Sequence, residues 1–225
     1  MHANDDDTLV ESLAGQAETV RTARSFAADA AIAVSPITFK PRANLVALAA
    51  GMPMKPAPTD PRQGSLLGAG WTAISFKYLA ESGADSVTYF ETAGPRGIVT
   101  DTAASSVFPV YHVLADIGEF AGGEVIRCTS SCPLRADAVL LALGHHRCLL
   151  TASFMAVTQT IVLQGEFGIL QATVRTLDEA NAGDPIFEPE HYRADPGCRA
   201  YAAPGELRLQ MRPYALARID WDEAG

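Results

Sequence analysis

One acidic residue, Glu91, stands where a strand-like run of the sequence ends. In the stretch DSVTYFETAGPRG, residues 85–97, a β-favouring run of Val, Thr, Tyr and Phe stops at Glu91, and the turn pair Gly94-Pro95 follows at once. A carboxylate at the end of a parallel strand can act as a general base, because the carboxyl ends of such strands form the ligand-binding edge of the sheet. The alternative is that Glu91 caps the next element, and the residue pattern alone leaves both interpretations open.

Further polar residues flank the same predicted strand ends. If the strands are neighbours, these side chains meet at the carboxyl-terminal edge of the sheet. There they could activate water and bind an oxyanion or a sugar hydroxyl. Each also has a simpler interpretation, as a chain terminus, a solvated surface charge or a packed ring. The candidate substrate-binding residues are His2, Asn4, Ser35, Thr38, Arg42, Tyr89 and Arg96.

The composition predicts a folded globular protein that binds a neutral or polar small molecule. The chain has 225 residues, of which 48% are hydrophobic and 19% charged, and its formal net charge is -9. This charge argues against nucleic acid as a partner, since backbone phosphates require clustered Lys and Arg. No apolar stretch reaches the roughly 20 residues of a membrane span, and no signal peptide is recognisable, so we expect a cytoplasmic protein without a membrane partner. The four cysteines lack CxxC spacing, so we expect no metal and no cofactor.

The first half of the chain alternates between helical and strand-like patterns. Such alternation is typical of βα units on a parallel sheet. Trp71 and Tyr78 share the apolar stripe of one predicted helix, which favours a core position over a sugar-stacking one. The predicted order is a helix over 5–28, a strand covered on both faces over 30–39, a proline-rich loop over 40–62, a helix over 65–83, a strand over 85–91, a short strand over 97–100 and a helix over 108–123.

From residue 124 the pattern changes to short alternating strands separated by turns, which predicts an antiparallel β-sandwich. The fold class is therefore α/β plus all-β, with domains over 1–123 and 124–225. His145 and His146 fall at a hairpin tip, where solvent exposure is favoured over metal binding, and Tyr214 or Trp221 would anchor the β domain. The predicted strands cover 124–130, 138–154 with the hairpin tip inside, 157–165, 169–178 and 205–221.

Several long stretches resemble, in order and spacing, the later part of the D-apionate lactonase family. They are HANDDDTLVESLAGQAETVRTARSFA, AVSPITFKPRAN, DPRQGSLLGAGWTAISFKYLAESGADSVTYFETAGPRGI and FPVYHVLADIGEFAGGEV. The resemblance implies the last strands and helices of a (β/α)8 TIM barrel related to glycoside hydrolases, followed by a C-terminal β domain. It also implies hydrolysis of a branched sugar-acid lactone to the open aldonate.

The resemblance implies a role for each candidate residue. Glu91 matches the catalytic glutamate that ends the seventh barrel strand. His2 would close the fifth strand, Ser35 and Thr38 would lie at the sixth, and Arg42 would begin the loop after it.

The chain departs from the family by starting near the end of strand five. The usual partner carboxylate of glycosidase chemistry comes from strand four, which is absent, so we expect a fragment with about three of eight strands that a separately encoded N-terminal half could complete. Two alternatives stay open: a glycoside hydrolase fragment, and a non-catalytic remnant whose β domain packs or binds carbohydrate.

Overall fold

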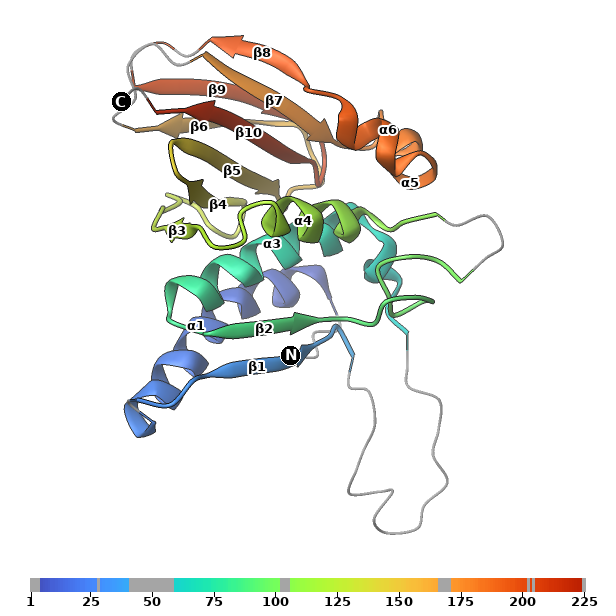
Figure 1. Ribbon diagram of the computed structural model, residues 1–225. Helices are drawn as coiled ribbons and strands as arrows, with labels where there is room; N and C mark the ends of the chain where they lie inside the picture. Colours follow the sequence, from blue (N-terminus) through green and yellow to red (C-terminus); the bar gives the residue numbers. More distant parts are fainter. Residues whose placement is uncertain are drawn as a thin grey trace.

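The computed structural model describes residues 5–27, 29–40, 59–101, 106–165, 171–201, 203 and 205–223 (Figure 1). Its first part combines a small parallel sheet with three longer helices. The helices are α1 (Asp6–Phe26), α3 (Leu66–Glu81) and α4 (Pro109–Gly118), preceded in the case of α3 by the 3₁₀ turn η1 (Pro61–Gly64). The strands are β1 (Ala33–Ile37) and β2 (Ser86–Tyr89).

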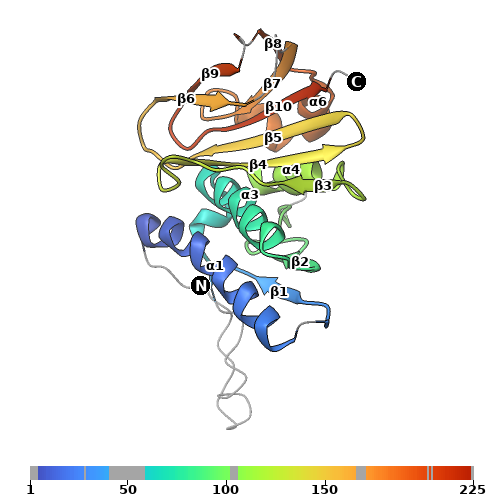
Figure 2. The same cartoon turned by 90° about the vertical axis from the view of Figure 1, so that its left-hand side faces the viewer.

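Helix α3 is the central element of the structure. Its surface is apolar nearly all round, and such a helix must be buried on every side. Ser65 caps its first turn by accepting the Gly68 N–H. Figure 2 shows α3 between α1 on one side and the strands of the second part on the other. Trp71 is 1% exposed, and its indole N–H donates to the Leu9 carbonyl at 3.0 Å, which confirms its predicted core position.

Strands β1 and β2 pair in parallel, with Val34 opposite Val87 and Ile37 opposite Tyr89. The prediction that both faces of the first strand are covered is wrong for the described chain, because Ala33 and Ser35 are exposed. One face of the β1–β2 sheet packs on the helices. None of the described residues forms a layer on its other face. The short strand predicted over 97–100 is also wrong, since only isolated bridges from Val99 occur there.

The second part consists of antiparallel strands, as predicted. A six-stranded sheet has the order β3-β4-β5-β10-β7-β8, and β6 pairs with β9 in a separate two-stranded sheet. Leu207 and Met211 of β9 pack against Ala172, Ala217 and Ile219 of the larger sheet. The strands are β3 (Glu124–Ile126), β4 (Ala136–Leu143), β5 (His146–Ser153), β6 (Gln159–Gln164), β7 (Gln171–Leu177), β8 (Cys198–Tyr201), β9 (Glu206–Met211) and β10 (Leu216–Asp222).

Three features of the second part differ from the sequence prediction. Two short helices, α5 (Gly183–Phe187) and α6 (Pro189–Ala194), and strand β8 were not predicted. The single strand predicted over 205–221 is the two strands β9 and β10, separated by a turn in which Tyr214 has a φ of 53°.

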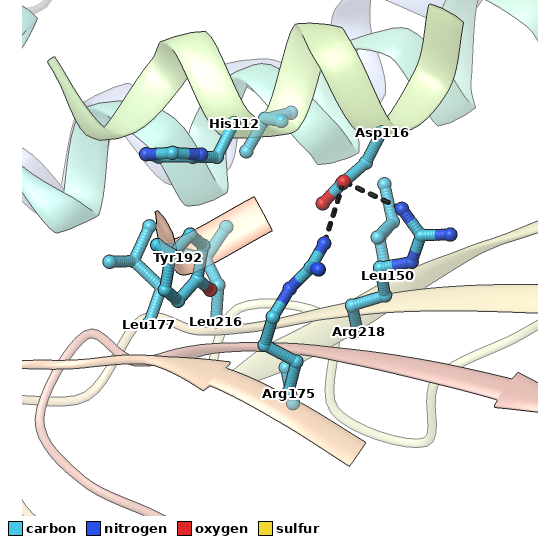
Figure 3. A pocket seen from close by; sticks show the side chains of 10 residues that line it. His112, Asp116, Leu150, Arg175, Leu177, Tyr192, Leu216 and Arg218 are labelled. Carbon is cyan, nitrogen blue, oxygen red and sulfur yellow. Dashed lines mark hydrogen bonds and ion pairs between the residues drawn. The ribbon is translucent and has the colours of Figure 1, made fainter. Parts of the chain in front are cut away.

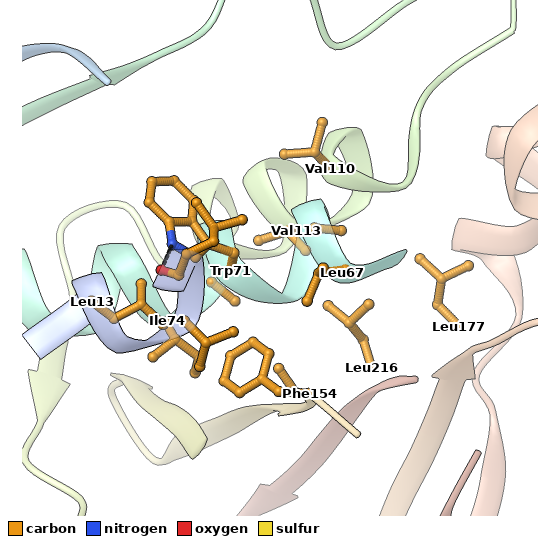
Figure 4. Packing of buried hydrophobic residues seen from close by; sticks show 14 of the residues in the cluster. Leu13, Leu67, Trp71, Ile74, Val110, Val113, Phe154, Leu177 and Leu216 are labelled. Atoms are coloured by element: carbon orange, nitrogen blue, oxygen red, sulfur yellow. Dashed lines mark hydrogen bonds between the residues drawn. The ribbon is translucent and has the colours of Figure 1, made fainter. Parts of the chain in front are cut away.

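The largest apolar core joins the two parts (Figure 4). Leu13, Trp71 and Val113 from the helices belong to the same cluster as Phe154, which follows β5, and Leu216 of β10. Tyr214 packs against this cluster and Trp221 against the core between the sheets. The division at residue 123 stays a prediction. Within the described residues, no helix is both long and apolar enough to cross a membrane.

Candidate functional site

A tight loop at the end of β2 presents Glu91. The strand stops because Phe90 takes a left-handed φ of 56°, which turns the chain out of the sheet. The Glu91 N–H donates to the Arg96 carbonyl at 3.0 Å, and the Gly97 N–H donates to the Gly94 carbonyl at 2.8 Å. Gly94 has a φ of 85°, a conformation that glycine adopts without strain. These bonds close the loop on itself.

The loop brings the Glu91 carboxylate and the Arg96 guanidinium together as a two-point ion pair. Arg96 Nε lies 3.0 Å from Glu91 Oε1, and Nη2 lies 3.2 Å from Oε2. Both side chains are about one-third exposed, at 33% for Glu91 and 32% for Arg96. A bidentate contact of this kind fixes the plane of the carboxylate while solvent can still reach it.

Gly97 is required for the loop because no space exists for a side chain. A Cβ on Gly97 would lie 2.6 Å from the backbone of Ala93. We therefore expect Gly97→Ala to force the loop open and to lower the free energy of unfolding by about 1–3 kcal/mol, measured by urea denaturation. Gly118→Ala is the control, because nothing lies within 4 Å of a Cβ there. Equal stability of the two variants would contradict this account of the loop.

The other predicted substrate-binding residues fall in different places. Ser35 is exposed on β1, and the Thr38 hydroxyl donates to the Lys40 carbonyl at 2.8 Å. The Tyr89 hydroxyl lies 2.9 Å from the Ser75 hydroxyl of α3, so this ring points into the helix layer rather than to Glu91. Burial raises the pKa of Tyr89 above its usual range. His2, Asn4 and Arg42 lie outside the described residues.

A second charged group at this edge was missed by the sequence interpretation. Arg62 holds Asp60 by two contacts, with Nε 2.9 Å from Oδ1 and Nη2 2.7 Å from Oδ2, and Lys40 Nζ lies 3.7 Å from the same carboxylate. Burial raises the pKa of Asp60, but the hydrogen bonds and charge of Arg62 outweigh it, so the pKa lies below its ordinary value. The Gln63 side chain donates to the Gly97 carbonyl at 2.7 Å. This bond ties the Asp60 group to the Glu91 loop.

A pocket lies between α4 and the large sheet (Figure 3). His112 lines it and is 2% exposed, and its Nε2 lies 2.9 Å from the Pro185 carbonyl. A carbonyl oxygen can only accept, so Nε2 carries the proton and Nδ1 is the bare nitrogen. The cavity is about 20 Å³, which is room for one water molecule and too little for a sugar.

Asp116 makes the same region a structural junction. Its Oδ1 accepts from Arg175 of β7 at 3.1 Å, from Arg193 of α6 at 3.0 Å and from Arg218 of β10 at 2.7 Å. One carboxylate on α4 thus connects to three elements of the second part. Because the three cations face Asp116 and its neighbouring acids, the group is charge-balanced and favours a packing role over anion binding.

Burial of His112 makes stability depend on pH. Desolvation lowers its pKa below the ordinary 6.5, although the Pro185 carbonyl and Asp116 act in the other direction. The unfolded chain therefore takes up this proton near pH 6.5 while the folded chain does so at lower pH, so stability falls as the pH drops below about 6.5. We expect His112→Gln, which keeps a donor for Pro185 without titrating, to flatten this part of the profile. Parallel profiles from urea denaturation at pH 5.5–7.5 would contradict the prediction.

One of the two hairpin-tip histidines contacts two carboxylates. His146 lies between Asp220 and Asp222, with Nε2 and Nδ1 at 3.2 and 3.1 Å from their carboxylates, and its side chain is 43% exposed. Among the residues that the structure describes, no group of three or more His, Cys, Asp or Glu side chains is arranged to hold an ion.

The solved structures most similar to the chain include several glycoside hydrolases. A GH30 endoxylanase from Clostridium papyrosolvens matches with a TM-score of 0.54 and 8% identity, over 72% of this chain and 40% of the other. A GH30 subfamily 8 xylanase from Clostridium acetobutylicum gives 0.54 and 11%, over 84% and 46%. A conserved exported protein from Bacteroides fragilis gives 0.59 and 11%, over 97% and 45%. At these identities the likeness shows the fold alone.

The chain spans less than half the length of each of these structures. The likeness supports a TIM-like fold for the parallel strands and helices of the first part. None of the curated proteins compared with the chain matches it. The family model of the D-apionate lactonase TIM barrel domain matches residues 1–122, more than half of the sequence. The chain belongs to the D-apionate lactonase family.

Proposed function

We propose that this chain is the C-terminal part of a hydrolase that opens a sugar-acid lactone, such as the lactone of D-apionate, with water. In this proposal β1 and β2 are neighbouring strands of a (β/α)8 barrel, and the two antiparallel sheets are the layers of a β-sandwich. The family match supports the substrate class, and the similar solved structures support a carbohydrate-active hydrolase fold.

The observation that carries the proposal is the position of Glu91. Its carboxylate follows a parallel strand at the carboxyl end, where barrels bind their substrates. The loop hydrogen bonds and the Arg96 contact hold it in one orientation, yet one-third of it is open to solvent. A general base needs this combination of fixed geometry and access.

The chemistry follows from these positions. The Glu91 carboxylate removes a proton from water as the water oxygen bonds to the lactone carbonyl carbon, and the π electrons move to the carbonyl oxygen. The positive charge of Arg96 lies next to Glu91 and favours the oxyanion that forms. When the carbonyl re-forms, the bond to the ring oxygen breaks, and that oxygen takes the proton from Glu91. The product is the open hydroxy acid, which ionises at neutral pH.

The remaining candidates bind substrate hydroxyls in this proposal. Ser35 and Thr38 lie on or just after β1, and the Asp60 carboxylate with its partners Lys40 and Arg62 lies near the same edge. His2, Asn4 and Arg42 stay candidates from the sequence, whereas Tyr89 points away from this edge into the helix layer. The exposed face of the β1–β2 pair supports completion of the sheet by further βα units, supplied by a second polypeptide that carries the N-terminal half of the barrel.

The test is hydrolysis of lactones, followed by pH-stat titration of the released acid, and of aryl glycosides, followed by the absorbance of the released phenol. The 225-residue chain is assayed alone and with a polypeptide that supplies the other barrel strands, against sugar-acid lactones and aryl glycosides. We expect acid release from lactones above the spontaneous rate, either from the chain alone or from its mixture with the second polypeptide. We expect no cleavage of the glycosides. Cleavage of glycosides but not lactones would favour glycoside hydrolysis, and no cleavage in either arm would favour a non-catalytic packing or carbohydrate-binding role.

A further inference from the structure

The turn η1 contacts the beginnings of all three long helices. Ser65, which follows η1, caps α3, and Arg62 donates to the Asp5 carbonyl at the start of α1 at 3.1 Å. A Cβ on Gly64 would lie 3.2 Å from the ring of Phe108, the residue that precedes α4. These contacts hold η1 at the end of the helix layer where the three helices begin.

Gln63 lies within this turn and reaches the Glu91 loop. The residue is only 5% exposed. Its backbone N–H donates to the Asp60 carbonyl at 3.0 Å, and its side-chain Nε2 donates to the buried Gly97 carbonyl at 2.7 Å. Such a bond is costly to lose, because a buried acceptor without a partner keeps its full desolvation cost. Gln63 thereby connects the helix layer to the loop after β2.

Three hydrogen bonds hold the two peptide groups that follow Arg96. The Arg96 carbonyl accepts from the Glu91 N–H at 3.0 Å, and the Gly97 N–H donates to the Gly94 carbonyl at 2.8 Å. These two bonds set the shape of the loop, since both partners belong to it. The third bond, from Gln63 to the Gly97 carbonyl, relates the position of the loop to the helix layer.

We propose that Gln63 is a positioning residue for the Glu91–Arg96 pair. Gln63 holds the peptide group directly after Arg96, and Arg96 holds both oxygens of the Glu91 carboxylate. A displacement of the loop would therefore move the base and its neighbouring positive charge together, relative to a substrate at the strand ends. An error of about 1 Å in such a position can lower a rate about 100-fold. The catalytic importance of Gln63 rests on the proposed function at Glu91.

The hold on the loop is tested first without turnover, by amide hydrogen exchange of the 225-residue chain followed by NMR. Gln63→Met keeps the length of the side chain and removes the donor. We expect the Glu91 and Gly97 amides to exchange at least 10-fold faster in this variant, and amides in the middle of α3 to exchange as in the parent, because the opening is local (on the order of one lost buried hydrogen bond).

Gln16→Met is the matched control for the exchange experiment. It also removes a side-chain hydrogen bond in the helix layer, since Gln16 Oε1 accepts from the Ser75 hydroxyl at 2.6 Å. The control should leave the exchange of the loop amides unchanged. Parent-like exchange of the loop amides in Gln63→Met would overturn the proposal. An equal acceleration in α3 would overturn it too, because the whole fold and not the loop would then depend on Gln63.

Turnover separates this proposal from the function at Glu91. In the lactone assay, Gln63→Met should lower kcat about 10- to 100-fold and change KM less than about 2-fold, since a misplaced base slows the chemical step without altering binding. In the Glu91→Gln background the same replacement should cost less than about 3-fold, because Gln63 acts through that carboxylate.

The outcomes of the two experiments are distinguishable. Parent-like kcat in Gln63→Met, or an equal loss with and without the Glu91 carboxylate, would overturn the positioning role. Faster loop exchange in Gln63→Met, in a chain that opens no lactone, would sink the lactonase proposal and retain the role of Gln63 in holding the loop.

Discussion

Replacing Glu91 by Gln should lower the turnover of a sugar-acid lactone by at least 100-fold. The amide keeps the size of the side chain but cannot take a proton from water, and base catalysis contributes about 10²- to 10⁴-fold. The fold should be unaffected, because a partly exposed ion pair such as Glu91–Arg96 contributes about 0–1 kcal/mol. The measurement is pH-stat titration with the parent chain and the variant at matched concentrations, in the arm where the parent is active.

Glu11→Gln is the matched control for this prediction. Glu11 is exposed on α1 and carries the same charge, so its replacement reproduces the change in net charge without touching the loop. Parent-like turnover in Glu91→Gln would remove Glu91 from the chemistry. A loss of turnover in Glu11→Gln as well would show that net charge, and not the base, is responsible.

Breaking the Lys77–Asp137 pair should destabilise the protein by about 3–5 kcal/mol. Lys77 Nζ of α3 lies 2.5 Å from Asp137 Oδ1 of β4, and the two side chains are only 4% and 1% exposed. Asp137→Ala leaves a buried ammonium without its counter-charge, which costs far more than the pair itself contributes. Urea denaturation gives the free energy of unfolding for parent and variant.

The double replacement Lys77→Met with Asp137→Leu distinguishes this mechanism from a loss of packing. It removes both charges together, so we expect it to recover most of the loss that Asp137→Ala produces. Glu18→Ala is the surface control, because it breaks an ion pair with Arg21 whose side chains are 71% and 52% exposed and should change stability little. A double variant as unstable as Asp137→Ala would contradict the charge argument.

Long periodic segments were predictable from the sequence, since their pattern is local. The apolar spacing of Leu9, Leu13 and Val20 identified α1, and the turn at Gly144 identified the β4–β5 hairpin. Segment 183–194 lacked such a signal, because α5 and α6 are too short for a helical period and are interrupted by Pro185 and Pro189. The exposed face of β1 could not be predicted either. An apolar run indicates that a strand is suited to burial on both faces, but it does not indicate whether the described chain contains a layer that covers both.

The candidate site was predictable where its residues are close in sequence. Glu91 and Arg96 are five residues apart and meet across one turn. The Asp60 group was missed because its link to the Glu91 loop runs through Gln63, more than thirty residues from Gly97, and no local pattern reports such a contact. Tyr89 was grouped with Glu91 because they are neighbours in sequence, whereas the alternation of side chains along a strand turns its ring to the helices.

The core shared between helices and strands has a consequence for how the molecule folds. Trp71 and Val113 are buried in the same apolar cluster as Phe154 and Leu216, which belong to the other part of the chain. Neither part can then separate from the other without exposing the apolar interior of both. We therefore expect the helical layer and the six-stranded sheet to melt in one cooperative step. The stability of the Glu91 loop would then depend on a sheet whose strands begin more than thirty residues further along the chain.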